Sequence, residues 1–161
     1  MRRRPALLFI ALSVGGCGSR TEGDFRLLRG DSKLAHIVDL AQVDTDRDGI
    51  RRVTVTSITE SPVATPAGRP GQYARIRYAF DCANLRYRGE GVTVYDAAFE
   101  TLDEVTQRSP WRPVSAPPSL TSDFRRFCAL RPSGADLPKV VGPDWRAAAR
   151  SSLARLRAEG H

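Results

Sequence analysis

Apolar and polar side chains alternate most regularly between residues 73 and 82. One parity holds Ile76, Tyr78, Phe80 and Cys82. The other parity holds Arg75, Arg77 and Asp81. Because side chains of a β-strand alternate between its two faces, this pattern predicts a half-buried strand with a thiol at the end of its apolar face. The polar face is expected to lie toward solvent.

Further strands are predicted on both sides of this one. Residues 33–43 have the parity of a strand, although the spacing of Leu34, Ile37, Val38 and Ala41 also fits a helix. The acidic turn at 44–49 and the alternating residues 52–59 favour a β-hairpin. Shorter strand candidates are residues 25–28 and 101–106. Residues 85–88 and 91–95 are expected to form either one bent strand or two short strands. Residues 61–71 hold three prolines and two glycines and are expected to form an exposed loop.

Two helices are predicted toward the C-terminus. Ser119 can cap the first and Pro132 ends it. One face of this helix holds Leu120, Phe124, Phe127 and Cys128. Pro143 can occupy the first turn of the second helix, which runs to about residue 158. Because the apolar stripe of this helix is thin, the helix can dock weakly on the sheet, fray or contact a partner. The stripe consists of Trp145, Ala148, Ala149, Leu153 and Leu156.

The first 16 residues are typical of an export signal. Arg2, Arg3 and Arg4 precede an apolar run at 6–14 that is too short to span a bilayer. Small residues then precede Cys17, which resembles a bacterial lipobox. We expect lipid on Cys17, a flexible tether over 17–24 and a bacterial envelope location, with the outer membrane preferred. An ordinary secretory signal with an incidental cysteine is the alternative.

Export changes what the other two cysteines are expected to do. Outside the cytoplasm, Cys82 and Cys128 are predicted to form a structural disulfide. A redox-active pair or a metal site is the alternative, but the chain lacks a Cys-x-x-Cys motif and its only histidines are His36 and His161. Closing a loop between positions 46 residues apart contributes about 4 kcal/mol in the chain-entropy account.

The charge of the chain argues against a nucleic-acid partner. The formal net charge is +7; without the three leader arginines, 22 Lys and Arg face 18 Asp and Glu, a net charge of +4. The basic residues are spread along the chain, whereas nucleic-acid binding usually needs a clustered basic stripe. A mild attraction to anionic envelope surfaces is expected instead.

An acidic loop is the candidate metal site. Asp44, Asp46 and Asp48, followed by Gly49, match the opening of a calcium loop. The position of the closing glutamate is Val55, and the flanks read as strands. The alternative is a hairpin loop whose aspartates cap their own backbone. Calcium or small-ligand binding by this loop is therefore the second functional hypothesis.

Two further groups of residues were weighed for chemistry. His36 and Asp39 lie close in sequence but without an evident nucleophile, and no catalytic or phosphate-loop motif is present, so no enzyme and no cofactor are predicted. Arginines on two neighbouring strands could serve solubility and cross-strand pairing, or could recognise acidic groups of lipopolysaccharide or of a partner protein. They are Arg75, Arg77, Arg86 and Arg88.

Several of these segments, in this order, resemble the bacterial surface-adhesin protein E domain family over about residues 25–130. They are residues 37–39, 52–55, 78–82, 85–88, 111–114 and 127–128. The resemblance implies a single antiparallel sheet with a helix held to it through Cys82 and Cys128. The best-known type is a surface lipoprotein that binds host extracellular-matrix proteins. The 61–71 segment and the helix at Trp145 depart from the family pattern.

The sequence thus predicts an α+β domain: one antiparallel sheet of about five to six strands, a disulfide-tethered short helix and a further C-terminal helix. The expected organisation is a lipoprotein signal at 1–16, a tether at 17–24, the adhesin-like domain at 25–131, and a loop with an amphipathic helix at 132–161. The expected function is a non-catalytic, lipid-anchored binding or structural module of the cell envelope. Its expected partners are the membrane and envelope or extracellular proteins, and the sequence leaves a homodimer open.

Overall fold

The structure is a computed structural model that describes residues 23–31, 33–65, 68–114, 125, 127–129 and 137–159. The predicted export signal, the lipidated Cys17 and most of the tether lie outside the described residues. The predicted start of the short helix at Ser119 also lies outside the described residues. Residues 127–129 of this helix are described and are helical. In the part of the chain that the structure describes, no helix has the length and apolar character needed to cross a membrane.

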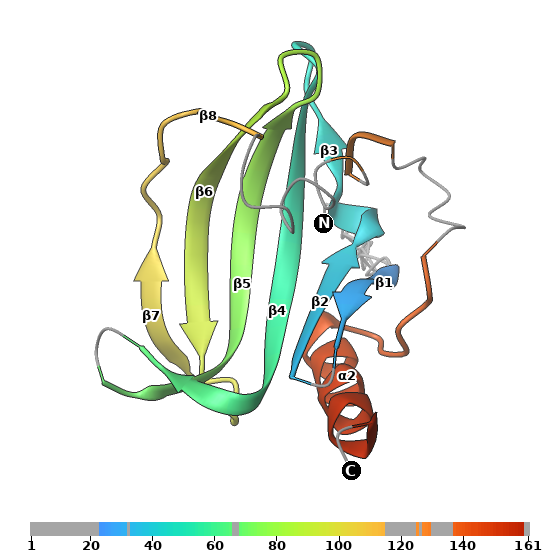
Figure 1. Cartoon of the computed structure of the whole chain (residues 1–161), viewed down its shortest axis with the longest axis vertical. Coiled ribbons are helices and arrows are strands. Elements are labelled where there is room, and N and C mark those ends of the chain that lie inside the picture. Colours follow the sequence, from blue (N-terminus) through green and yellow to red (C-terminus); the bar gives the residue numbers. More distant parts are fainter. Residues whose placement is uncertain are drawn as a thin grey trace, which may run out of the picture.

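One antiparallel sheet organises the chain (Figure 1). Its strands are β1 Phe25–Gly30, β2 Leu34–Asp39, β3 Asp44–Thr45, β4 Ile50–Ala64, β5 Pro70–Asp81, β6 Arg86–Tyr95, β7 Thr101–Val105 and β8 Arg112–Pro113. The main order is β1-β2-β4-β5-β6-β7, with β3 paired to β4 and β8 paired to β6. The described part of the sheet therefore has eight strands, slightly more than predicted, because two short strands add to the six of the main order.

The predicted strand at 73–82 is confirmed as part of β5, and the two alternatives at 85–95 resolve to the single strand β6. The helical alternative for residues 33–43 is wrong: β2 occupies most of this stretch, and only the short 3-10 helix η1, Leu40–Gln42, follows it. Asp39 caps η1 by accepting a hydrogen bond from the Ala41 N–H at 3.1 Å. The alternating pattern therefore outweighed the helical spacing here.

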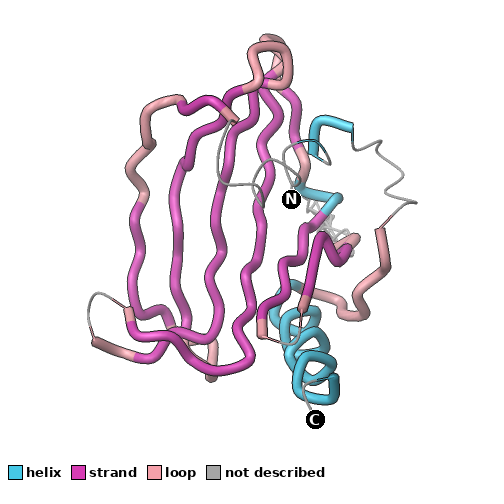
Figure 2. Tube along the Cα trace, in the orientation of Figure 1, coloured by secondary structure: helices cyan, strands magenta, loops and turns pink. Residues whose placement is uncertain are grey.

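The loop predicted at 61–71 is wrong in large part, although residues 61–64 and 68–70 are exposed as expected. β4 continues to Ala64 and β5 begins at Pro70, and the two strands pair again at Val63 with Gly71. A register irregularity between Ile58 and Val63 contains Pro62, which therefore interrupts no ladder bond. The proline-rich stretch forms the curved arm of a long hairpin (Figure 2).

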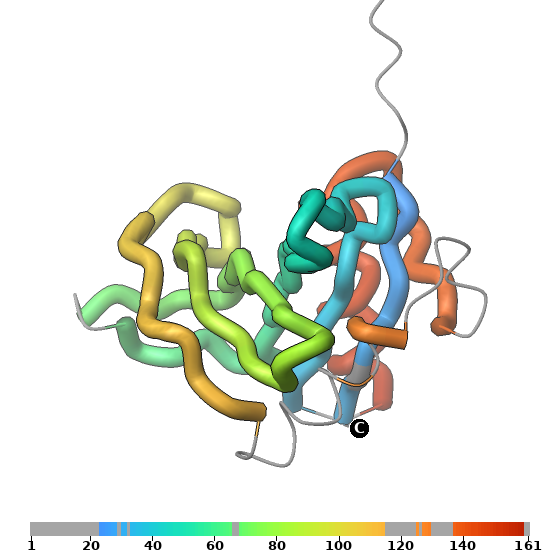
Figure 3. The backbone as a smooth tube through the Cα atoms, turned by 90° about the horizontal axis from the view of Figure 1, so that it is seen from above, coloured from blue at the N-terminus to red at the C-terminus, as the bar shows by residue number. Residues whose placement is uncertain are grey.

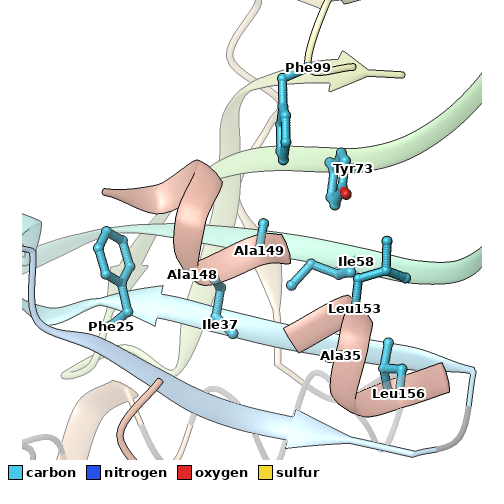
Figure 4. Packing of buried hydrophobic residues seen from close by; sticks show 10 residues of the cluster. All are labelled: Phe25, Ala35, Ile37, Ile58, Tyr73, Phe99, Ala148, Ala149, Leu153 and Leu156. Carbon is cyan, nitrogen blue, oxygen red and sulfur yellow. The ribbon is translucent and has the colours of Figure 1, made fainter. Parts of the chain in front are cut away.

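The helix α2, Trp145–Glu159, covers one face of the sheet. Figure 4 shows the core that it closes against β1, β2, β4 and β5. This cluster, core cluster 1, consists of Phe25, Ala35, Ile37, Ile58, Tyr73, Phe99, Ala148, Ala149, Leu153 and Leu156. The predicted thin stripe is therefore docked on the sheet, with Trp145 partly buried at its start. Seen from above, α2 and β7 lie toward opposite ends of the molecule (Figure 3).

The opposite face of the sheet carries a second core. Ile37 and Val38 are consecutive in β2 and belong to different clusters, so the two clusters lie on opposite faces. Core cluster 2 consists of Leu28, Val38, Val53, Val55, Phe80 and Phe127. The predicted disulfide between Cys82 and Cys128 is present and places Phe127 against Phe80, with ring centroids 4.9 Å apart. The tethered helical residues thus cover the face that α2 leaves open.

Both faces of β5 are consequently covered over part of their length. The expectation that the polar face of β5 lies in solvent is wrong for Arg75, which is half-buried, and for Asp81, which is 4% exposed. Only Arg77 on this face is exposed. Arg75 lies over the Trp145 ring of α2, and Asp81 forms an ion pair with Arg86; alternation within one strand reveals neither contact.

The chain that leads into α2 is attached to the edge of the sheet. The Leu27 N–H donates to the Pro138 carbonyl at 2.8 Å, and the Val140 N–H donates to the Phe25 carbonyl at 2.9 Å. The Asp144 carboxylate then accepts from the Ala147 N–H at 2.8 Å and caps the helix. These bonds hold the start of α2 beside the start of β1.

Candidate functional site

The register of β5 with β6 places the predicted surface arginines on one face of the sheet. A bulge between Arg77 and Tyr78 leaves Glu90 as the extra residue of β6. Arg88 and Arg86 therefore lie opposite Ala79 and Asp81, which have the same parity in β5 as Arg75 and Arg77. Because opposed residues share a face, Arg75, Arg77, Arg86 and Arg88 all project from the face that α2 covers in part.

Glu90 is the centre of one group of arginines. Its side chain is 11% exposed, and its carboxylate lies 2.8 Å from Arg88 Nη2, 3.4 Å from Arg52 Nε and 3.6 Å from Arg108 Nε. Arg52 also forms an ion pair with Asp46 at 2.8 Å. A single carboxylate thus organises three guanidinium groups drawn from β4, β6 and the residues after β7.

Arg86 extends this group toward the end of β5. Its Nε donates to Asp81 Oδ2 at 2.7 Å, and its guanidinium carbon lies 5.0 Å from the centre of the Trp111 ring, over which Arg88 also lies at 4.5 Å. The hydrogen bond from Asn84 lowers the pKa of Asp81 below 3.8; burial opposes this shift, and the hydrogen bond from Arg86 adds to it. We call Arg52, Arg86, Arg88 and Arg108 the paired arginine cluster.

A second group of arginines surrounds Trp145 and Phe99. The guanidinium carbon of Arg75 lies 4.9 Å from the centre of the Trp145 ring. That of Arg146 lies 5.6 Å from the centre of Trp145 and 5.9 Å from the centre of Phe99. That of Arg150 lies 5.2 Å from the centre of Phe99. Arg146 and Arg150 come from α2 and are exposed. Together with Arg77 on β5, they form what we call the unpaired arginine cluster: Arg75, Arg77, Arg146 and Arg150.

Gly91 makes room for Arg77. A Cβ atom at Gly91 would lie 2.6 Å from Arg77 Nη2 and 2.9 Å from the Val105 carbonyl oxygen, both too close for a carbon atom. The Arg77 guanidinium therefore lies against the backbone of β6, where any other residue would displace it. Glycine within a strand commonly marks such a close approach.

The acidic loop does not assemble a metal site in the structure. Asp46 Oδ1 accepts hydrogen bonds from the Asp48 and Ile50 N–H groups, each at 3.0 Å, and Asp46 Oδ2 pairs with Arg52. Partial desolvation opposes these bonds, but together they lower the pKa of Asp46. Asp44 and Asp48 are exposed, and no group of three His, Cys, Asp or Glu side chains within the described ranges could hold a metal ion. The structure therefore supports the self-capping alternative.

The predicted pair His36 and Asp39 has a structural explanation. Asp39 is 5% exposed, and its Oδ1 accepts hydrogen bonds from the N–H groups of Asp24 and Ala41, each at 3.1 Å. His36 lies opposite Ser57 on β4, on the other face of β2 from the arginines. Asp39 thus fastens the start of β1 to the end of β2.

Two hollows lie away from both arginine clusters. The larger, about 230 Å³, lies in the bend of the β4–β5 hairpin, and no charged residue lines it; Val63, Thr65, Ala74 and Val94 are among its walls. The smaller, about 130 Å³, lies between β1 and α2, and its Arg155 and Glu159 pair with each other at 2.8 Å. Neither hollow brings together a set of groups suited to catalysis.

Sequence reasoning found the sheet arginines and missed those of α2 as part of the same surface. Arg146 and Arg150 are one helical turn apart and both follow Trp145 in the sequence, which was the available signal. It could not be used without knowing that the helix docks beside Phe99. A family model described as Surface-adhesin protein E matches residues 25–129. No curated protein and no solved structure matches the chain.

Proposed function

Because the chain belongs to the Surface-adhesin protein E family, we propose that it is a lipid-anchored, non-catalytic binding module of the bacterial cell envelope. Membership of this family supports an adhesin-like protein at the envelope or cell surface. The finer parts of the proposal are the lipid on Cys17, residence in the outer membrane and the recognition of acidic groups by the arginine-bearing face of the sheet.

The row of arginines on one face of a disulfide-braced sheet is the observation that carries the binding role. Arg75 and Arg77 are the members of this row that are without carboxylate partners among the described residues, since Arg86 and Arg88 pair with Asp81 and Glu90. Arginine presents a planar fork of donors that suits carboxylate and phosphate groups. The binding surface therefore centres on Arg75 and Arg77, and its ligand is an acidic component of the envelope or an extracellular protein.

The anchor is supported by the sequence of the leader. Three arginines, a short apolar run and small residues before Cys17 resemble the signal of a bacterial lipoprotein. Mass spectrometry of the N-terminal peptide from membranes is expected to find a lipid-bearing Cys17. The Cys17→Ala chain is expected to lack this mass and to leave the membrane fraction; retention of both would contradict the anchor.

The binding role is tested by crosslinking in intact cells. The wild-type chain is expected to capture an envelope component that the Arg75→Gln/Arg77→Gln double variant loses. The matched control is Arg47→Gln/Arg112→Gln, which removes two exposed arginines from elsewhere on the surface. Equal capture by all three chains would refute the arginine face as the binding surface. Light scattering of the purified chain distinguishes a monomer from the homodimer that the sequence leaves open.

A further inference from the structure

The unpaired arginine cluster carries positive charge that the rest of the described chain does not neutralise. None of its four guanidinium groups forms a hydrogen bond or an ion pair with another residue of the described ranges. Two carboxylates near these elements bind backbone instead: Asp96 accepts from the N–H groups of Ala98 and Glu100, and Asp144 caps α2. The cluster therefore differs from ordinary surface arginines that pair across strands.

Arg75 adds a second and independent observation. Its Nε is buried and has no hydrogen-bond partner among the described residues. Leaving a buried donor of a charged group without an acceptor costs free energy. An anion at the remaining N–H groups of the half-buried Arg75 would offset part of this cost by neutralising the guanidinium charge. The uncompensated charge of Arg75 thus favours a ligand at this end of the surface.

Aromatic rings give the cluster a fixed shape. The Trp145 ring lies 4.9 Å from Tyr95 and 5.4 Å from Phe99, and the Phe99 ring stacks on Tyr73 at 4.4 Å. Guanidinium groups above these rings are attracted by the ring faces, which leaves their N–H edges free to donate outward. Phosphate oxygens match this arrangement, since guanidinium groups bind them in a bidentate manner.

The position of the cluster relative to the start of the domain suggests which phosphate it meets. Phe25, the first residue of β1, belongs to the same core cluster as Ala148 and Ala149, and Figure 4 shows it beside Ala148. Arg146 and Arg150 flank these two alanines. The residues from Cys17 to Phe25 can span at most about 28 Å. A lipid on Cys17 would therefore keep the cluster close to the membrane surface.

We infer that the unpaired arginine cluster binds phosphate groups of anionic lipid headgroups in the membrane that holds the chain. This inference rests on the proposed lipid anchor and names the ligand of the proposed binding surface. Each arginine near an anionic membrane contributes about a fivefold gain in partitioning, so four of them orient the domain as well as retain it. The face that carries α2 and β5 then lies against the headgroups.

Vesicle flotation of the full chain carrying Cys17→Ser tests the inference without any contribution from lipid. Binding is expected to vesicles of phosphatidylcholine with phosphatidylglycerol, to be absent with phosphatidylcholine alone, and to fall as salt rises. The Arg146→Gln/Arg150→Gln variant is expected to bind roughly 30-fold more weakly. The matched control, Arg86→Gln/Arg108→Gln, removes the same charge from the paired cluster and is expected to retain binding within about threefold.

Each alternative outcome overturns the inference. Equal losses in the two double variants would mean attraction to net charge alone, and binding to phosphatidylcholine would mean apolar insertion. Inorganic phosphate is expected to compete only weakly with vesicles; full competition at equal phosphate concentration would assign the site to free phosphate. Binding to polyglutamate but not to vesicles would assign it to an acidic protein. The lipid mass of the wild-type chain is measured separately, so a missing anchor and a non-binding cluster are distinguished.

Discussion

The paired and unpaired arginine clusters occupy one face of one sheet and differ in their counter-ions. In the paired cluster, Glu90 and Asp81 are nearly buried and each meets at least one guanidinium group within 2.8 Å. In the unpaired cluster, aromatic rings take the place of carboxylates beneath Arg75, Arg146 and Arg150. Both arrangements hold guanidinium groups in place, but only the second leaves their charge available to a ligand.

The difference arises from the elements that supply each cluster. The bulge of β6 inserts Glu90 between arginines of neighbouring strands. The first turn of α2 contains no acidic residue, and the Asp144 carboxylate before it caps the helix, so Arg146 and Arg150 form no ion pair with the described residues of α2. We therefore assign a mainly structural role to the paired cluster and a binding role to the unpaired cluster.

The largest expected effect is a difference in stability between the variants that remove Trp145 and Trp111. Trp145→Ala removes the ring that supports Arg75 and Arg146 and that packs on core cluster 1, so we expect a loss of about 3 kcal/mol in the free energy of unfolding. Trp111→Ala leaves the ion pairs of Arg86 and Arg88 intact and is expected to cost about 1 kcal/mol. Urea unfolding of both variants measures the difference. Equal losses would mean that the rings support the two clusters alike.

Removing the Glu90 carboxylate should make the paired cluster resemble the unpaired cluster, because its arginines lose a shared counter-ion. Glu90→Gln leaves Arg52, Arg88 and Arg108 without their shared carboxylate, and we expect a loss of about 2 kcal/mol at low salt. The variant should also bind anionic vesicles more tightly than the wild type. Glu100→Gln, an exposed residue, is the control and should leave stability within about 0.5 kcal/mol. Unchanged stability in Glu90→Gln would show that the ion pairs of Glu90 contribute nothing.

The paired cluster should also make stability depend on pH. The folded-state pKa of Asp81 is below its ordinary value of 3.8, so its stabilisation is fully present above that value and is lost as the pH falls through the folded-state pKa. Asp81→Asn is expected to cost about 1–2 kcal/mol at pH 7 and progressively less in acid. Thermal unfolding across this range, with exposed Asp48→Asn as the control, measures the effect. A constant difference at all pH values would contradict an ionised Asp81 as its source.

The smallest expected effect lies in the unpaired cluster itself. Arg146→Gln and Arg150→Gln should each change the free energy of unfolding by no more than about 0.5 kcal/mol, since no ion pair is broken. Arg88→Gln should cost about 1 kcal/mol, because Glu90 then loses its closest partner. Guanidinium chloride unfolding compares the three variants. A larger loss in the α2 variants than in Arg88→Gln would reverse the roles assigned to the clusters.

Much of the fold follows from local patterns. Alternation predicts β5 because one face of a strand must bury its apolar residues, and the acidic Asp-Gly turn predicts the pairing of β2 with β4. The disulfide was predicted from the expected export of the chain and from the two thiols that the expected lipid on Cys17 leaves. The arm at 61–64 was missed because prolines usually end a sheet; here the register irregularity leaves Pro62 outside the ladder. The bulge at Glu90 was missed because the pattern of residues 85–95 fits one bent strand or two and does not give the register.

The sequence by itself determined most of the strands, the C-terminal helix, the pairing of Cys82 with Cys128 and the presence of arginines at alternate positions of β5. Those properties depend on neighbours along the chain and on the chemistry of single residues. Only the tertiary structure decided which arginines are neutralised. Ion pairing and ring contacts act over a few ångströms, and the partners concerned come from distant parts of the chain: Glu90 reaches Arg52 across the sheet, and α2 brings Arg146 and Arg150 to Phe99.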